Sequence, residues 1–250
     1  NILSFKQLVE IKNFAKIKKI ILFATPGDFK SLEIIKKLKF PAIKISSGLI
    51  TNEALLIEAA KTNLPIILST GMAYLSEIKK ASQILKKYKN KKYSILKCTS
   101  LYPSPASKVN LNSIITLGEL FNVPIGFSDH TKNNDACIAS VSLGAKIIEK
   151  HFTLDKRLKV PDQKISADPN QFSKLVKSIR NIEKLLGNKD IFPSKEEIKK
   201  RKINHRTIIS IKKIKKDEIF TIKNIALKRS LNSNSGLHPR YFFKIIGKKN

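Results

Sequence analysis

Two histidines lie shortly after apolar segments that have the composition of β-strands. His130 follows Pro124–Phe127, and His151 follows Ala145–Ile148. Neighbouring strands of a sheet lie about 4.8 Å apart, so two imidazoles at the same end of adjacent strands can share one divalent metal ion. Each histidine also has a carboxylate beside it in the sequence, which favours this reading over two ordinary structural histidines.

A lysine and several hydroxyl side chains lie near the ends of the predicted strands. They are Thr25, Lys44, Ser47, Ser69, Ser100 and Ser128. Ammonium and hydroxyl donors that converge on one point suit a phosphate or a phosphorylated enol. Taken singly, each Ser or Thr could equally be a turn or helix-cap residue. Lys44 differs, because it lies between Ile43 and Ile45, where a buried cation needs an anionic partner.

A loop aspartate is a further candidate. Asp162 and Gln163 follow the last predicted strand, on the side where the other candidates gather. The Asp162 carboxylate could orient a sugar hydroxyl or transfer a proton. Without further context it could also be an ordinary loop residue.

The elements that would position these residues alternate along the chain. The predicted strands are Ile20–Phe23, Ala42–Ile45, Pro65–Leu68, Tyr93–Leu96, Pro124–Phe127 and Ala145–Ile148. The predicted helices are Leu32–Lys39, Glu53–Thr62, Leu75–Lys89, Asn134–Leu143 and Asn170–Leu186. Apolar strands that alternate with amphipathic helices are typical of a parallel α/β sheet.

A closed barrel is favoured over an open doubly wound sheet. No Gly-x-Gly-x-x-Gly sequence follows any strand, which weakens a dinucleotide-binding sheet. Polar residues at every strand end fit the mouth of a (β/α)8 TIM barrel. Since only six units are visible, we expect the first two strands to be missing and to precede Asn1.

The domain organisation follows from a change of pattern after the last long helix. We expect residues 1–187 to be a partial barrel, 188–204 a linker or a helix leading away, and 205–250 a small β-rich module. The expected strands of this module lie around Thr207–Ile211, Ile219–Thr221 and Ile225–Leu227.

The composition of the chain limits the kinds of partner that it could bind and the compartment in which it could work. The chain has 49 Lys and Arg against 19 Asp and Glu, a net charge of +30. Lysines scattered along every helix indicate a solvated surface that could steer anions, so we expect no nucleic-acid partner. No apolar run approaches the roughly 20 residues of a membrane helix, so we expect no membrane association. Cys98 and Cys137 have no metal-binding or redox spacing, which favours a reduced, cytoplasmic location.

Seven ordered motifs resemble one family, the N-acetylneuraminate (sialic acid) synthases with their legionaminate and pseudaminate synthase relatives. The motifs are FATP (Phe23–Pro26), PAIKISSG (Pro41–Gly48), PIILSTGMA (Pro65–Ala73), LKCTSLYPSP (Leu96–Pro105), GFSDHT (Gly126–Thr131), IIEKHFTLD (Ile147–Asp155) and PDQKIS (Pro161–Ser166). The C-terminal segment KKDEIFTIKNIALKR (Lys215–Arg229) is similar to the antifreeze-like (SAF) domain of the family.

The resemblance implies roles for the candidate residues. His130 and His151 correspond to the histidines that hold Mn²⁺ or Mg²⁺ in the family. The lysine and hydroxyl set named above falls where the family binds phosphoenolpyruvate. Tyr102 and Asp162 fall where it contacts the acceptor sugar or metal-bound groups, and Lys44 is expected to take part in catalysis with them. Arg229 matches an arginine that enters the partner subunit's active site, which implies a domain-swapped homodimer.

The implied reaction condenses phosphoenolpyruvate with an N-acetylated hexose such as N-acetylmannosamine and releases phosphate. The alternatives are another phosphoenolpyruvate-dependent keto-sugar-acid synthase, or a non-catalytic lysine-rich binding protein.

The chain departs from the family at Leu49, where many members have an acidic residue, and at Ser230-Leu231, which replaces Pro-Gly. The SAF module also stops early, near Gly247. Because a family glutamate and lysine would lie in the absent strands, we expect residues 1–250 to be inactive alone.

Overall fold

A computed structural model describes residues 3–159, 161–229 and 236–250 of the chain. The chain divides into two compact units, Asn1–Gly187 and Asn188–Asn250, which are described separately. The elements of the first unit are α1 (Phe5–Ile17), α2 (Phe29–Lys37), β1 (Ile43–Ile45), η1 (Ser47–Leu49), α3 (Glu53–Lys61), β2 (Ile66–Ser69), α4 (Leu75–Lys87), β3 (Tyr93–Cys98), α5 (Ala106–Val109), α6 (Ser113–Leu120), β4 (Ile125–Asp129), α7 (Asp135–Ser142), β5 (Ile147–Lys150) and α8 (Pro169–Leu186). Those of the second are α9 (Lys195–Asn204), β6 (Arg206–Ser210), β7 (Ile225–Arg229), η2 (Pro239–Tyr241) and α10 (Phe242–Ile245).

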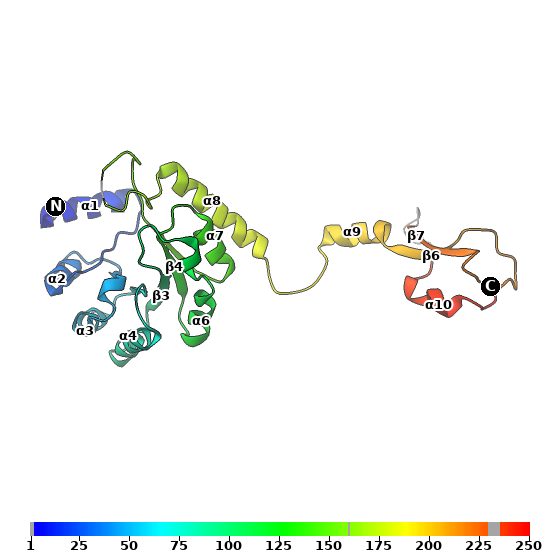
Figure 1. Cartoon of the computed structure of the whole chain (residues 1–250), viewed down its shortest axis with the longest axis horizontal. Helices are drawn as coiled ribbons and strands as arrows, with labels where there is room; N and C mark the ends of the chain where they lie inside the picture. The colour runs from blue at the N-terminus through cyan, green and yellow to red at the C-terminus, as the bar shows by residue number, and fades with distance from the viewer. Residues whose placement is uncertain (1–2, 160, 230–235) are drawn as a thin grey trace. The chain divides into compact units, whose positions relative to one another are not determined.

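The first unit is built on a five-stranded parallel sheet in the order β1-β2-β3-β4-β5. Strand order equals sequence order, because each strand is followed by a helical crossover to its neighbour. Figure 1 shows the helices α2, α3, α4, α6 and α7 in an arc outside these strands. The first unit is therefore an α/β fold with a parallel half-barrel sheet.

The two faces of this sheet differ in chemistry, because side chains alternate between the faces along each strand. The outward face is apolar and packs under the helices; its buried members include Ile43, Ile45, Ile66, Leu68, Ile95, Ile125 and Phe127. The inward face becomes polar toward the C-terminal ends of the strands, where Lys44, Ser69, Cys98, Ser128 and Glu149 lie. The half-barrel thus presents polar side chains at one end.

Local sequence explains where the long helices begin. Asp28 accepts a hydrogen bond from the backbone N–H of Ser31 (2.7 Å) and caps α2. Asp168 caps α8 in a capping box with Gln171, and Pro169 occupies the first turn. Such caps satisfy backbone donors that have no partner within the helix, and proline has no such donor to satisfy.

Most of the predicted elements of this unit are confirmed, but the first strand is wrong. Within the described residues, Ile20–Phe23 forms no strand, and the segment contributes only a single parallel bridge between Ala24 and Ile43. β1 has only three residues, and the segment meets it at Ala24, whose carbonyl oxygen accepts from the Lys44 N–H at 3.0 Å. The side chains of Ile20 and Ile21 are therefore exposed rather than packed.

Gly126 lies on the crowded inward face of β4. A Cβ atom at this position would come within 2.4 Å of Leu96 Cδ2 and 2.5 Å of the Ile147 carbonyl oxygen. We expect Gly126→Ala to lower the free energy of unfolding of this unit by about 1 to 3 kcal/mol, because an overpacked core must shift backbone. Urea unfolding checks this.

The matched control for this substitution is Gly118→Ala in the exposed part of α6, where the added Cβ meets nothing nearer than 4.0 Å. We expect this control to be neutral or stabilising by up to about 1 kcal/mol, because alanine favours helix over glycine. Equal unfolding midpoints for the two variants would contradict the packing argument.

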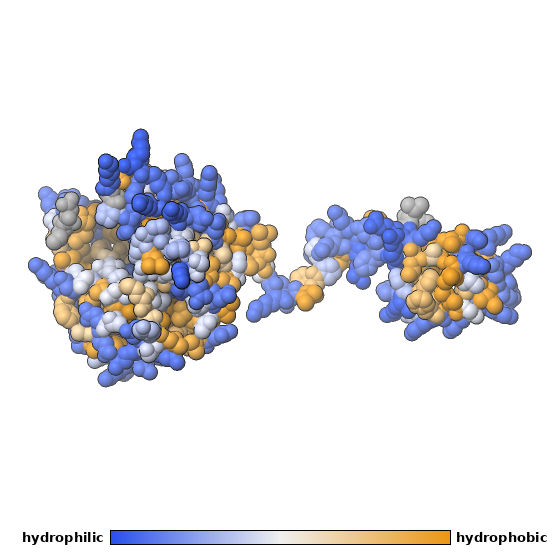
Figure 2. All heavy atoms as spheres, in the orientation of Figure 1, coloured by the Kyte–Doolittle hydropathy of each residue, from blue (hydrophilic) through white to orange (hydrophobic). Residues whose placement is uncertain are grey.

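The second unit contains an antiparallel pair, β6 and β7, that buries Ile208 and Ile225. The predicted strand Ile219–Thr221 is wrong; Ile219 makes only one isolated bridge, to Lys249. Residues 188–204, which were expected to form a linker or a helix, contain the helix α9. Apolar residues gather on the face of this unit that Figure 2 shows, and Phe243 on α10 is 86% exposed.

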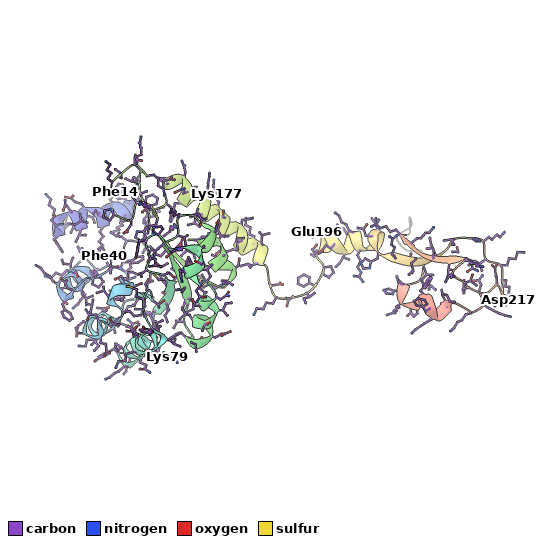
Figure 3. The ribbon with its side chains drawn as sticks, in the orientation of Figure 1. Phe14, Phe40, Lys79, Lys177, Glu196 and Asp217 are labelled. Atoms are coloured by element: carbon purple, nitrogen blue, oxygen red, sulfur yellow. The ribbon has the colours of Figure 1, made fainter. Side chains whose placement is uncertain are left out.

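The lysines of the first unit lie largely on its surface. Lys79 on α4 and Lys177 on α8 are exposed and point away from the sheet, whereas Phe40 is buried (Figure 3). This placement fits the interpretation of the basic charge as a solvated surface. No helix in the described part of the chain is long and apolar enough to cross a membrane.

Candidate functional site

The polar end of the half-barrel is organised around a buried lysine. Lys44 Nζ donates to Ser69 Oγ at 2.8 Å and lies 3.3 Å from Glu149 Oε2. The second Glu149 oxygen accepts a hydrogen bond from Ser128 Oγ at 2.7 Å. Lys44 is only 7% exposed, and buried charges in proteins are paired, as this one is with Glu149. Four strands thus contribute to one cluster of a cation, a carboxylate and two hydroxyls.

Glu149 was not among the predicted site residues. The sequence carried a signal for it, because a lysine between two buried isoleucines requires an anion nearby. What the sequence could not supply was the curvature of the sheet, which brings Glu149 on β5 to Lys44 on β1 although these are its two edge strands.

A second group of small side chains lies beside this cluster. Ser47 Oγ accepts a hydrogen bond from the Gly71 N–H (2.9 Å) and donates toward Cys98 Sγ (3.4 Å). Ser100 Oγ lies 3.8 Å from the same sulfur. Burial alone would raise the pKa of the Cys98 thiol, but hydrogen bonds from His130 and Ser47 lower it to about 7. Cys98 was not predicted as a site residue either.

The two histidines lie together at this end of the sheet. Their ring centroids are 5.2 Å apart, and each residue directly follows its strand. His130 Nδ1 lies 2.8 Å from the Thr99 carbonyl oxygen, which can only accept a hydrogen bond. Nδ1 therefore carries a proton, and the lone pair of Nε2 is available to a metal ion. His151 Nδ1 lies 3.8 Å from Asp162 Oδ2.

The surroundings of the two histidines shift their pKa values in opposite directions. Burial disfavours the charged form of His130, yet its hydrogen bonds with Cys98 and the Thr99 carbonyl raise its pKa. Burial and the neighbouring His130 lower the pKa of His151. A lowered pKa keeps an imidazole neutral to lower pH, and a metal ligand must be neutral.

The donor set at the histidine pair fits a divalent ion that retains other ligands. Among the described residues, no group of three or more His, Cys, Asp or Glu side chains is already arranged to hold a metal ion. His130 and His151 could supply two nitrogens, and the Asp162 carboxylate is near. Imidazole nitrogens and carboxylate oxygens are both ligands of divalent metal ions, and water or substrate oxygens would complete the shell.

Tyr102 and Asp162 border the histidine pair. The Tyr102 ring lies 4.2 Å from the His130 ring and 5.8 Å from the His151 ring, centroid to centroid. Burial and the nearby Cys98 raise the pKa of the Tyr102 hydroxyl, so it remains a hydrogen-bond donor. Tyr102 and Asp162 also line a cavity of about 310 Å³, together with Leu158, Lys159, Gln163, Lys164 and Ile165.

Two predicted site residues differ from the rest in their surroundings. Thr25 is exposed, and none of the described hydrogen bonds connects its side chain to the other candidates. Arg229 lies in the second unit, opposite Arg206 in the β6–β7 ladder, so its role in the active site stays a prediction. The departure at Ser230-Leu231 lies outside the described residues.

A larger cavity of about 900 Å³ lies next to the site rather than in it. It is lined by residues of the loop after β3 and of the start of α7, including Pro103, Asn110, Asn112, Thr131, Asn133 and Asp135. None of the predicted site residues lines it, so cavity size alone does not identify the site in this chain.

Gly71 contributes backbone to the site and leaves no space for a side chain. A Cβ atom there would come within 2.1 Å of Ser100 Oγ and 2.7 Å of Ser47 Oγ. We expect Gly71→Ala to weaken the binding of an anion at these hydroxyls by about tenfold or more, since both hydroxyls must move and a 1 Å misplacement can cost that much. The measurement is the dissociation constant of inorganic phosphate, with Gly118→Ala as the control. An unchanged constant would show that these hydroxyls do not bind the anion.

The model of the family described as "NeuB family" matches residues 2–191 of this chain. The N,N'-diacetyllegionaminic acid synthase of Campylobacter jejuni is 40% identical over 250 residues, which cover 99% of this chain and 75% of that protein. The pseudaminic acid synthase of Helicobacter pylori is 37% identical over 96% of this chain and 70% of that protein.

A solved structure has a similar fold. The N-acetylneuraminic acid (sialic acid) synthetase from Leptospira borgpetersenii superposes with a TM-score of 0.76 at 39% identity, over 80% of this chain and 70% of that one. The likeness in sequence and fold thus extends across the half-barrel that carries the cluster.

Proposed function

Since this chain belongs to the NeuB family, we propose that it is a nonulosonic acid synthase that condenses phosphoenolpyruvate with an N-acetylated hexose such as N-acetylmannosamine and releases phosphate. Its relatives with sialic, legionaminic and pseudaminic acid synthase names support an enzyme of this kind. The observation that supports the reaction most is the cluster around Lys44, which offers a cation and hydroxyl donors beside a histidine pair.

The phosphate of the substrate is proposed to bind at the Lys44 cluster. Lys44 supplies a positive charge, and Glu149 pairs with its ammonium group. Ser69 and Ser128 in the cluster, and Ser47 and Ser100 beside it, supply hydroxyls. Donors that are already oriented stabilise developing negative charge without reorganising, which is the largest electrostatic contribution in many enzymes. Thr25 is proposed to join this set when substrate is bound.

The proposed chemistry forms one carbon–carbon bond and replaces one carbon–oxygen bond, because the oxygen of water takes the place of the bridging phosphate oxygen. The two protons of this water end on the former aldehyde oxygen and on the released phosphate. The enol carbon of phosphoenolpyruvate attacks the aldehyde carbon of the open-chain sugar, and the aldehyde oxygen takes up a proton. Water then adds to the carbon that bears the phosphate, and phosphate leaves with its bridging oxygen. A Mn²⁺ or Mg²⁺ ion held by His130 and His151 would polarise the aldehyde as a Lewis acid.

The acceptor sugar is proposed to lie against Tyr102 and Asp162. These side chains border both the histidine pair and the 310 Å³ cavity. A hydroxyl and a carboxylate can orient sugar hydroxyls, and Asp162 is proposed to take part in proton transfer.

The remaining proposals concern assembly and location. We propose that the half-barrel is part of a (β/α)8 barrel and that the second unit is an SAF domain. In a domain-swapped homodimer, Arg229 would then enter the partner's active site. A cytoplasmic location fits the two free, buried cysteines, since a reducing compartment keeps such thiols unpaired.

Phosphate release tests the proposed reaction. The purified full-length protein is incubated with phosphoenolpyruvate, Mn²⁺ and a panel of N-acetylated hexoses, and each component is omitted in turn. We expect release that requires the metal and one sugar of the panel, and the mass of the keto-acid product identifies the reaction. Release with a sugar phosphate outside this panel would instead support another keto-sugar-acid synthase. A folded protein that binds metal but releases no phosphate would support a binding role.

A further inference from the structure

A buried ion pair lies directly beside the two histidines. Asp129 precedes His130, Lys150 precedes His151, and the two charged residues are register partners across β4 and β5. Lys150 Nζ lies 2.7 Å from Asp129 Oδ2, and the side chains are 2% and 0% exposed. Because side chains alternate along a strand, the charged pair faces the helices and the histidines face the opposite side.

Both charges are fully satisfied by hydrogen bonds. Lys150 Nζ also donates to the carbonyl oxygens of Thr131 (2.6 Å) and Asn133 (3.1 Å). Asp129 accepts from the N–H of Thr131 (2.8 Å) and from the thiol of Cys137 on α7 (3.2 Å). The ammonium group therefore ties β5 to β4 and to the loop that follows His130.

Stability alone gives little reason for such a pair. Removing two charges from water is costly, and well-packed apolar side chains of similar volume often stabilise a fold as much or more. Phe127 and Ile125 on this face of β4 are apolar, whereas the half-buried Lys97 on β3 lies on the same face beside Phe127 and donates to the Cys98 carbonyl and to Thr99 Oγ1. The pair of Asp129 and Lys150 differs in that it occupies the register position next to both histidines, which points to a positional role.

We propose that Asp129 and Lys150 are positioning residues that fix the separation of His130 and His151 for a shared metal ion. A salt bridge between β4 and β5 restrains the translation and twist of one strand relative to the other. It does so one residue before both histidines, whose ring centroids lie 5.2 Å apart. Groups that orient metal ligands typically change metal affinity by about 10- to 100-fold when they are lost. This inference rests on the proposed metal role of the histidines.

Binding of Mn²⁺, measured by electron paramagnetic resonance of the free ion, tests the proposal without any turnover. The variants are Asp129→Asn, Lys150→Met and the double substitution, each with thermal unfolding measured alongside. We expect all three to bind Mn²⁺ about 10- to 100-fold more weakly. We expect the double variant to regain stability relative to either single one, because it no longer buries an unpaired charge. The double variant should therefore regain stability without regaining affinity for Mn²⁺.

Phe127→Leu is the matched control. Phe127 lies on the same face of β4, is 1% exposed and belongs to the apolar core. This variant should unfold at a lower temperature yet bind Mn²⁺ like the wild type. Wild-type affinity in the folded double variant would overturn the positioning role alone. A wild-type protein that binds no Mn²⁺ would overturn the metal role and this inference together.

Discussion

Replacing Lys44 with methionine is expected to lower kcat/KM for phosphoenolpyruvate by about 100- to 1,000-fold, the range seen when one oriented donor to a developing anion is removed. Methionine keeps most of the length of the side chain but cannot donate to Ser69 or pair with Glu149. The site would then contain an unpaired carboxylate facing the phosphate, which opposes binding further. Steady-state phosphate release at varied phosphoenolpyruvate measures the effect.

The control is Lys36→Met, because Lys36 also pairs with a glutamate, Glu33, but on the exposed face of α2. Exposed pairs of this kind contribute little, so activity and stability should be nearly unchanged. The Lys44 variant must also be shown to fold, by comparing its thermal unfolding with that of the wild type. A folded Lys44→Met protein with wild-type kcat/KM would remove this residue from the proposed phosphate site.

Replacing His151 with glutamine is expected to weaken Mn²⁺ binding by more than about 100-fold, because a direct ligand should exceed the effect of its supporting groups. Phosphate release should fall in parallel, and added Mn²⁺ should recover part of it. Burial and the neighbouring His130 lower the pKa of His151, so its neutral form predominates at neutral pH and the loss should be evident there. Metal titration and phosphate release on the same samples check both statements.

His205→Gln is the matched control, since His205 is exposed at the C-terminal end of α9 in the other unit. We expect no change in Mn²⁺ affinity for this variant. Equal affinities of the His151 variant and the wild type would place the metal elsewhere, even if the activity of the variant were low.

The fold class could be predicted from the sequence because it depends on a pattern of neighbouring residues. Apolar runs of strand length alternate with amphipathic helices, and five of the expected strands are present as parallel neighbours. The two wrong strands, Ile20–Phe23 and Ile219–Thr221, have suitable composition. A strand exists only when a neighbour offers a ladder of hydrogen bonds, and that neighbour is remote in sequence.

The candidate site was only partly accessible. Residue types at strand ends indicated His130, His151 and Lys44, because parallel strands bring their carboxyl ends to one edge. The partner of Lys44 was expected to be an anion but could not be named, since Glu149 reaches it across the sheet. Arg229 rested on resemblance alone.

The sequence by itself thus determined the alternation of elements, the end of the sheet where polar groups gather, and the family. Those features depend on the spacing of apolar residues along the chain and on motifs whose residues are consecutive. The tertiary structure decided which side chains touch: Glu149 with Lys44, the Thr99 carbonyl with His130, and Lys150 with Asp129. Contacts between strands depend on register and twist, which many distant residues set jointly through packing.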